Sequence, residues 1–141
     1  MTEPLKSISL AEARDAMEGV MPAVVATCAA DGTPNVTYLS KVMYVDADHF
    51  ALSNQFFSKT VANIEQNPQA QITLLKPSTG RHFRFDAVYE RRESSGELFE
   101  RMRAEIDALA SMYGMQGVFK LRSADIYRVV RGEVVPTDGD D

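Results

Sequence analysis

The segment from Arg81 to about Arg92 constrains the fold more than any other part of the chain. Apolar side chains recur there at every second position, which indicates a long β-strand with one face packed on a core. The two expected faces are Phe83, Phe85, Ala87 and Tyr89 on one side, and His82, Arg84, Asp86, Val88 and Glu90 on the other. We therefore expect a sheet of long strands with a layer that covers its apolar face.

Turn residues divide the remaining apolar sequence into five further strands. We expect these strands at about 23–29, 35–45, 49–53, 70–75 and 123–130. The stretch Ala30-Asp31-Gly32-Thr33 is a hairpin signal between the first two. Asp46-Ala47-Asp48 turns the second into the third, and residues 76–80 form a turn before the long strand. Most connections are therefore of the hairpin type, which favours an antiparallel sheet.

Three helices are expected among these strands. Ser9 and Glu12 fit a capping box that opens a short helix, which Gly19 would end. A second short helix runs from Ser58 to Asn67 and stops at the next residue, a proline. The longest is capped by the stretch 94–97 and ends at Gly114. Its apolar stripe consists of Leu98, Met102, Ile106, Leu109 and Tyr113. Such a stripe is much more typical of core packing than of a cofactor pocket.

These elements predict a mainly β fold of the α+β class: a small six-stranded barrel or curled sheet that the long helix covers. No repeat or linker divides the sequence, so we expect a single domain over residues 1–141, with 1–8 and 136–141 flexible. A closed barrel of this size leaves little interior for a ligand. Binding would then fall on an outer groove or at a subunit interface.

Charge and hydropathy exclude some classes of function. The formal net charge of −5 argues against a protein that binds duplex nucleic acid, which needs a basic face. It permits a small anionic ligand held by a few local cations. No apolar run approaches the roughly 20 residues that span a bilayer. Residues 1–6 lack the basic-then-apolar pattern of a signal peptide, so a cytoplasmic protein is expected.

The chain has one cysteine and two histidines. Cys28 lies in an apolar strand and is expected to behave as a small hydrophobic residue, since nothing nearby would lower its pKa. His49 and His82 are isolated and are not spaced as metal ligands are, so the sequence carries no zinc or iron signature.

The strongest functional signal is the stretch from Ser53 to Thr60, where an expected strand gives way to a helix start. The first turn of a helix presents unpaired N–H groups and a positive dipole end, which suit a phosphate. Lys59 adds a positive charge there, and Ser58 and Thr60 add hydroxyl donors. The alternative is that Ser58 caps the helix and Lys59 is solvated. The motif alone favours neither.

The order of elements, with several short motifs, resembles the split β-barrel family of flavin-binding proteins related to pyridoxamine 5'-phosphate oxidase. The motifs are Val24-Val25-Ala26-Thr27, Asp31-Gly32-Thr33-Pro34-Asn35-Val36, Phe50-Ala51-Leu52-Ser53, Ser58-Lys59-Thr60 with Asn63, and Asn67-Pro68. Each motif is weak alone, but the series is fairly specific, and the layout from Phe83 to Val130 matches as well. The resemblance implies a six-stranded antiparallel split β-barrel with a covering helix.

The resemblance also implies a homodimer with two FMN sites at the subunit interface. By position, Ser58 and Lys59 would bind the FMN phosphate, with help from Thr60. Thr37 and Tyr38 would contact the flavin ring, which would lie along residues 35–39. Ser53 and Asn54 would approach the ring or the ribityl chain. For Tyr38, packing inside the barrel is an equally good alternative.

The chain departs from the family in two respects. Asn35 stands where many members have an arginine that pairs with the phosphate, so a bidentate charged contact is missing. There is no tryptophan, and the Trp- and Arg-bearing C-terminal segment with which true pyridoxamine phosphate oxidases hold substrate and cofactor is absent. We therefore do not expect this chain to make pyridoxal phosphate.

Three functions remain open on the sequence alone. The first is an FMN-dependent oxidoreductase acting on an unidentified small molecule. The second is a non-catalytic flavin-binding or ligand-sensing module. The third is a split barrel that binds haem or deazaflavin F420 instead, with His49 or His82 as haem ligand. Fold analogy does not decide among them.

Overall fold

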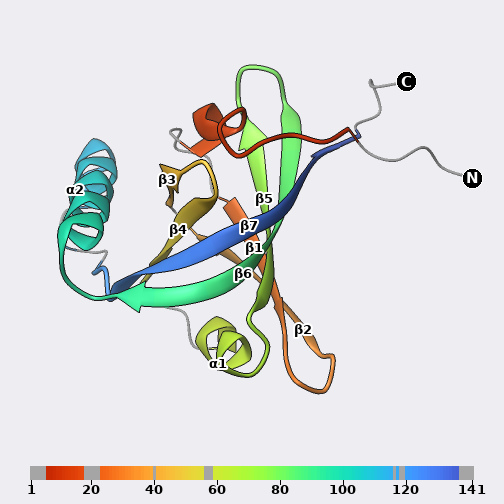
Figure 1. Ribbon diagram of the computed structural model, residues 1–141. Coiled ribbons are helices and arrows are strands. Elements are labelled where there is room, and N and C mark those ends of the chain that lie inside the picture. The colour runs from red at the N-terminus through yellow and green to blue at the C-terminus, as the bar shows by residue number, and fades with distance from the viewer. Residues whose placement is uncertain are drawn as a thin grey trace, which may run out of the picture.

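The computed structural model describes residues 6–17, 23–39, 41–55, 59–115, 117 and 120–136. Seven antiparallel strands form one sheet in the order β2-β1-β5-β6-β7-β4-β3. The strands are β1 (Ala23–Cys28), β2 (Pro34–Leu39), β3 (Val42–Asp46), β4 (His49–Asn54), β5 (Gln69–Lys76), β6 (Arg81–Glu93) and β7 (Ser123–Val135). The sheet curls strongly, and the helices α1 (Lys59–Gln66) and α2 (Glu97–Met112) lie on different sides of it (Figure 1).

The expected mainly antiparallel fold with a covering helix is confirmed, but the expected number of six strands is wrong. The segment 35–45 is two strands, and β2 and β3 lie at opposite ends of the strand order. The physical reason is a loss of alternation: Leu39, Lys41, Val42 and Met43 are all buried, so the period of two breaks between the strands. Ser40 and Lys41 are the polar residues at this break in the sequence.

The long strand β6 is the centre of the fold, as its alternation predicts. It pairs with β5 on one edge and with β7 on the other. Phe83, Phe85 and Ala87 are buried in the main core, and Tyr89 packs against it. The polar face of β6 is half-buried or exposed. The inner faces of the other strands add to this core, together with the N-terminal segment and Ile64 of α1, so the barrel interior is filled by side chains.

Helix α2 covers a second, smaller core formed by β3, β4 and β7. Met102 and Ile106 pack there against Met43, Ala51 and Ile126. The expected stripe is wrong at its last position, because Tyr113 is exposed. The N-cap is Gly96, which lies within the stretch expected to cap the helix and makes no side-chain hydrogen bond. Gly114, with φ of 65°, ends the helix as predicted.

The N-terminal segment is tied to β7. The expected capping box is present: the Ser9 backbone N–H donates to Glu12, and the Glu12 N–H donates to Ser9 Oγ. It leads only into a short 3₁₀ helix, Arg14–Met17, rather than into a helix reaching Gly19, which lies outside the described residues. The Ile8 N–H donates to the Gly132 carbonyl at 3.0 Å. Residues 6–8 of the segment expected to be flexible are therefore hydrogen-bonded to the sheet, whereas 1–5 and 137–141 lie outside the described residues.

We expect the Gly132→Ala variant to be destabilised by about 1–3 kcal/mol, the usual cost of overpacking a core. A Cβ at this position would overlap with the Ile8 carbonyl oxygen and with the Phe85 ring. Backbone cannot move aside as a flexible side chain does. Urea unfolding measures the effect, with Arg128→Ala as the control, since Arg128 is exposed on the same strand. Equal stability of Gly132→Ala and the wild type would contradict the close packing of residue 8 on β7.

His49, the first residue of β4, contacts two carboxylates: Asp46 at the end of β3 and Glu90 on β6. Its Nδ1 lies 2.8 Å from Asp46 Oδ1, and its Nε2 lies 2.5 Å from Glu90 Oε1. The hydrogen bond with Asp46 is the main cause that raises the pKa of His49, with Glu90 adding to it against the opposing effect of burial. The same contact lowers the pKa of Asp46. Both ring nitrogens of His49 are thus engaged.

We expect the His49→Gln variant to lose a pH-dependent part of the stability. Because the pKa of folded His49 is raised above 6.5, its ion pairs stabilise fully below that pH, and the stabilisation is lost as pH rises through the raised pKa. Pairs this exposed contribute less than about 1 kcal/mol. The urea midpoints of the variant and the wild type should differ near pH 6 and converge in alkali. His82→Gln is the control, and an equal pH dependence in that variant would count against this account.

Candidate functional site

The start of α1 lies against the inner face of β2. Asn35 Nδ2 donates to Thr60 Oγ1 at 3.3 Å, and Asn63 Nδ2 donates to Thr27 Oγ1 at 3.1 Å. Thr60 and Thr27 are buried, whereas Asn35 and Asn63 are not fully buried. These two bonds join α1 to β1 and β2. The structure therefore brings together Asn35 and Thr60, two predicted site residues that lie 25 positions apart in the sequence.

Lys59 is the first residue of α1 and is exposed. It has no ion-pair partner among the residues that the structure describes. A lysine without a carboxylate partner at a helix start keeps its charge available to an anion. Ser58, the other residue predicted to hold a phosphate, lies outside the described residues.

The predicted flavin-ring residues of β2 do not share one face. Asn35 pairs with Thr27 and Thr37 with Val25, so both side chains lie on the face of these buried residues. Tyr38 pairs with Val24 on the opposite, outer face and is 72% exposed. The alternative that Tyr38 packs inside the barrel is therefore wrong. One flavin ring on the inner face could not touch the side chains of both Thr37 and Tyr38.

Ser53 and Asn54, at the end of β4, are both buried and also face opposite ways. Ser53 lies opposite Ala124, whose side chain belongs to the core under α2. Asn54 lies opposite Ser123, on the face of the main core. Ser53 Oγ and Asn54 Oδ1 have no hydrogen-bond partner within the described part of the chain. Only Asn54 is placed to approach a ligand at the α1 side of the barrel, since Ser53 is directed towards α2.

An ion pair between a partly exposed arginine and a buried carboxylate, which the sequence analysis missed, lies beside Asn54. The Asp125 carboxylate is 1% exposed, and its Oδ1 accepts from Ser123 Oγ at 2.7 Å and from Arg92 Nε at 3.2 Å. Asp125 Oδ2 has no partner among the described residues. Burial of the Arg92 guanidinium disfavours its charge, but the Asp125 carboxylate outweighs this and raises the pKa of Arg92. Glu65 of α1 acts in the same direction, so the pair lies within electrostatic reach of α1.

Three aromatic rings lie within electrostatic reach of this pair through Tyr127 and Tyr89. Tyr127 stacks on Phe50 at 5.5 Å and meets Tyr89 edge-on at 5.5 Å. Burial raises the pKa of Tyr127, and the Asp125 carboxylate raises it further. The Tyr127 phenol therefore stays neutral at physiological pH.

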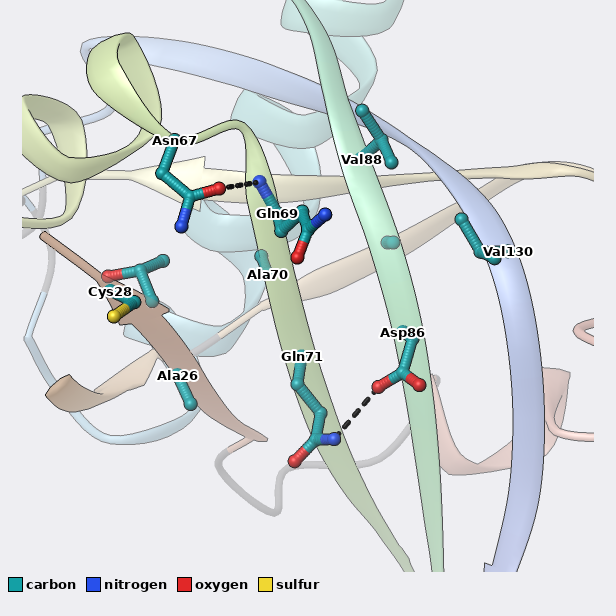
Figure 2. Close-up of a pocket in the computed structure, with 11 residues that line it drawn as sticks. Ala26, Cys28, Asn67, Gln69, Ala70, Gln71, Asp86, Val88 and Val130 are labelled. Atoms are coloured by element: carbon teal, nitrogen blue, oxygen red, sulfur yellow. Dashed lines mark hydrogen bonds between the residues drawn. The ribbon is translucent and has the colours of Figure 1, made fainter. Parts of the chain in front are cut away.

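The outer face of the sheet carries a groove of about 500 Å³ (Figure 2). Its floor is formed by β1, β5 and β6, and Val130 of β7 lies at one side. Gln71 Nε2 donates to Asp86 Oδ1 at 2.8 Å across the floor. Cys28 and Asn67 also line the groove. A mixed apolar and polar lining of this size is typical of a binding surface.

The described residues give no support for other kinds of site. No group of three His, Cys, Asp or Glu is arranged to hold a metal ion in the part of the chain described. No helix there is long and apolar enough to cross a membrane. Cys28 is half-buried, and the described structure gives it no neighbour that would activate a thiol.

The site fits a ligand with an anionic end and hydroxyl groups. Lys59 and the N–H groups at the start of α1 suit the anion. Asn54 Oδ1, a buried acceptor without a partner among the described residues, needs an O–H or N–H donor.

The comparisons with known proteins agree with the fold. The model of the pyridoxamine 5'-phosphate oxidase family matches residues 9–130. A sequence comparison with the curated proteins finds no match. Among solved structures, an FMN-binding protein from Syntrophomonas wolfei superposes with a TM-score of 0.77 at 17% identity, covering 91% of this chain and 86% of that one.

Two further structures show how ligands vary on this fold. One is named an F420 reductase, with a TM-score of 0.62 and 16% identity over 85% of this chain and 94% of that one. The other is HutZ, named as the haem storage protein of Vibrio cholerae, with a TM-score of 0.56 and 20% identity over 91% of each chain. At these identities the likeness establishes the fold alone.

Proposed function

Because the chain belongs to the pyridoxamine 5'-phosphate oxidase family, we propose that it binds FMN and acts as a flavin-dependent oxidoreductase on a small molecule. The observation that carries the proposal is the polar junction at the start of α1. There the exposed Lys59, which has no ion-pair partner among the described residues, adjoins Thr60, which the Asn35 amide holds. Among the described residues of the site, the start of α1 is where a cation, helix N–H groups and a hydroxyl group lie together.

Each of these residues would have a different role in binding FMN. Lys59 supplies charge to the phosphate, and Thr60 and the first N–H groups of α1 supply donors. Asn35 gives an amide proton to Thr60, so its part is to orient that hydroxyl, not to replace the missing arginine charge. Asn54 Oδ1 would accept from a ribityl hydroxyl. When bound, the flavin supplies the hydride or electron transfer.

We include a homodimer in the proposal. The outer face exposes apolar side chains, among them Val36, Tyr38 and Val130, each at least 60% exposed. A cluster of such residues on one face is typical of a surface that another protein covers. Tyr38 would then belong to the interface, whereas Thr37 lies on the inner face beside Asn35. Sedimentation at micromolar concentration should give twice the chain mass.

A flavin-binding or sensing module without catalysis is the second candidate. It is favoured by one observation, that no described acid or base near α1 is placed to act on a substrate. Mixing the FMN-loaded protein with NADH or NADPH under anaerobic conditions separates the two functions. Bleaching of the flavin bands followed by turnover with an added oxidant supports the enzyme. Retained FMN that neither reductant reduces supports the sensor.

Haem and F420 are the alternative ligands that the structural relatives suggest. For haem, His49 is a poor ligand because Asp46 and Glu90 engage both of its ring nitrogens. His82, half-buried on β6, remains the other candidate. For F420 the structure offers no observation that favours it over FMN, since both carry a phosphate.

A competition experiment tests the proposal. Purified protein is mixed with equimolar FMN, F420 and haem, the unbound fraction is removed, and the absorbance spectrum is recorded. The proposal predicts the two visible bands of FMN in the retained fraction. A Soret band, or the single visible band of F420, would identify the wrong cofactor.

A further inference from the structure

The outer face of the sheet has an ordered arrangement of side chains. Cross-strand partners form one row of Val36, Ala26, Gln71, Asp86 and Arg131 across five strands. A neighbouring row begins with Tyr38 and Val24. The groove of about 500 Å³ is lined by Ala26, Gln71 and Asp86 of the first row and extends over Cys28, Gln69 and Val88 on the side away from Tyr38. Tyr38 projects from the second row. A hollow and a protruding aromatic side chain thus lie on one face, separated by the width of the first row.

The groove suits an aromatic ring with a polar tip. Ala26, Val88 and Val130 give it apolar walls. The Gln71 and Asp86 side chains meet on its floor (Figure 2), and the Asp86 carboxylate is also paired with Arg131 at 2.9 Å. The charge of Asp86 is therefore balanced, while its oxygens keep lone pairs that can accept from a phenol. A tyrosine can bury its ring on such walls and donate its O–H to the floor.

We infer that Tyr38 inserts into the groove of a second copy of this chain. A two-fold interface uses the same patch on both subunits, so the protrusion and the hollow must both belong to one face. Tyr38 and the groove meet that condition, and each dimer would contain the contact twice. The inference rests on the proposed homodimer and names the residue that holds it together. A deeply inserted tyrosine is typical of an interface hot spot.

The second copy is favoured over a small ligand because the aromatic side chain that fits the groove belongs to the same face. Tyr38 is 72% exposed and lies on β2, which is at the end of the strand order. The described residues show no contact that fixes its ring in the monomer. The contact also matches chemically, because an apolar ring meets apolar walls and a phenol donor meets acceptors.

The Tyr38→Ala variant tests the inference, with Tyr113→Ala as the matched control. Tyr113 is similarly exposed, at 62%, but lies at the end of α2, away from the outer face. In sedimentation equilibrium, Tyr38→Ala should raise the dimer dissociation constant about 30-fold or more, as loss of a hot spot does. Tyr113→Ala should leave it within about threefold of the wild-type value.

A tryptophan reporter gives a second readout that does not depend on stability. The chain has no tryptophan, so Tyr38→Trp introduces a single emitter. Its emission should shift to shorter wavelengths as the protein concentration passes the dissociation constant. The emission of Tyr113→Trp should stay that of an exposed indole over the same range.

The outcomes separate this inference from the function proposed above. A wild-type dimer with an unchanged dissociation constant in Tyr38→Ala, or with exposed emission in Tyr38→Trp, overturns the insertion and leaves the dimer. A shift that accompanies FMN addition in a monomer also overturns it, since the groove would then take a ligand. A monomeric wild type that retains FMN refutes the insertion and the dimer but not FMN binding.

Discussion

The Arg92→Ala variant should be destabilised by about 1–3 kcal/mol, because it removes the charged partner of a buried carboxylate, although Arg92 itself is 33% exposed and water can replace part of its contact. Asp125 is 1% exposed, and Arg92 is the only described cation paired with it. Ser123 would remain as a donor to one carboxylate oxygen, which does not replace the lost charge. Urea unfolding monitored by circular dichroism at pH 7 measures the change.

Arg91→Ala is the matched control for this effect. Arg91 neighbours Arg92 on β6, but its carboxylate partner Glu93 is partly exposed, whereas Asp125 is buried. Removal of Arg91 should change the stability by less than about 0.5 kcal/mol, as for most exposed positions. The double variant Arg92→Met/Asp125→Leu should recover most of the loss, since an apolar pair can replace a buried ion pair. Similar stability of Arg92→Ala and Arg91→Ala would show that Asp125 does not depend on Arg92.

The Lys59→Ala variant should bind FMN about 10- to 150-fold more weakly than the wild type, which corresponds to about 1.5–3 kcal/mol for a charge-assisted hydrogen bond. Its affinity for riboflavin, which lacks the phosphate, should change little. Because Lys59 is exposed at the start of α1, its removal should not unfold the protein. Weaker FMN binding in this variant would therefore report the lost contact with the phosphate. Fluorescence titration with each flavin provides both affinities.

Lys76→Ala is the control for charge alone. Lys76 ends β5 at the far end from the α1 junction, so its removal changes the net charge equally without touching the site. An equal loss of FMN affinity in both lysine variants would point to a general electrostatic effect. An unchanged affinity in Lys59→Ala would refute the assignment of the phosphate to this helix start.

The elements with a clear period could be predicted from the sequence. The alternation in β6 predicted both its length and its inner face, since Phe83, Phe85 and Ala87 are buried. The strand count failed at 41–43, where three consecutive side chains are buried and a period of two cannot mark a boundary. The prediction that Tyr113 belongs to the buried stripe of α2 was wrong. A helix buries its apolar stripe only where another surface covers it, and Tyr113 is exposed.

The site could be predicted only in part. The junction at Lys59 and Thr60 was visible because strand, helix start and polar residues are consecutive in the chain. The pair of Arg92 and Asp125 was not visible, because the partners lie 33 positions apart and meet only through the register of β6 and β7. The opposite directions of Thr37 and Tyr38 follow from alternation, but the choice of inner face needed the pairing of β2 with β1.

The most direct test of the central claim is the FMN stoichiometry of the purified wild-type chain. Protein is titrated with FMN, the unbound flavin is removed, and the absorbance of the retained flavin is compared with the protein concentration. The account predicts close to one FMN per chain, with riboflavin retained far less. A protein that remains colourless after excess FMN would contradict the claim that the junction at Lys59 is a flavin phosphate site.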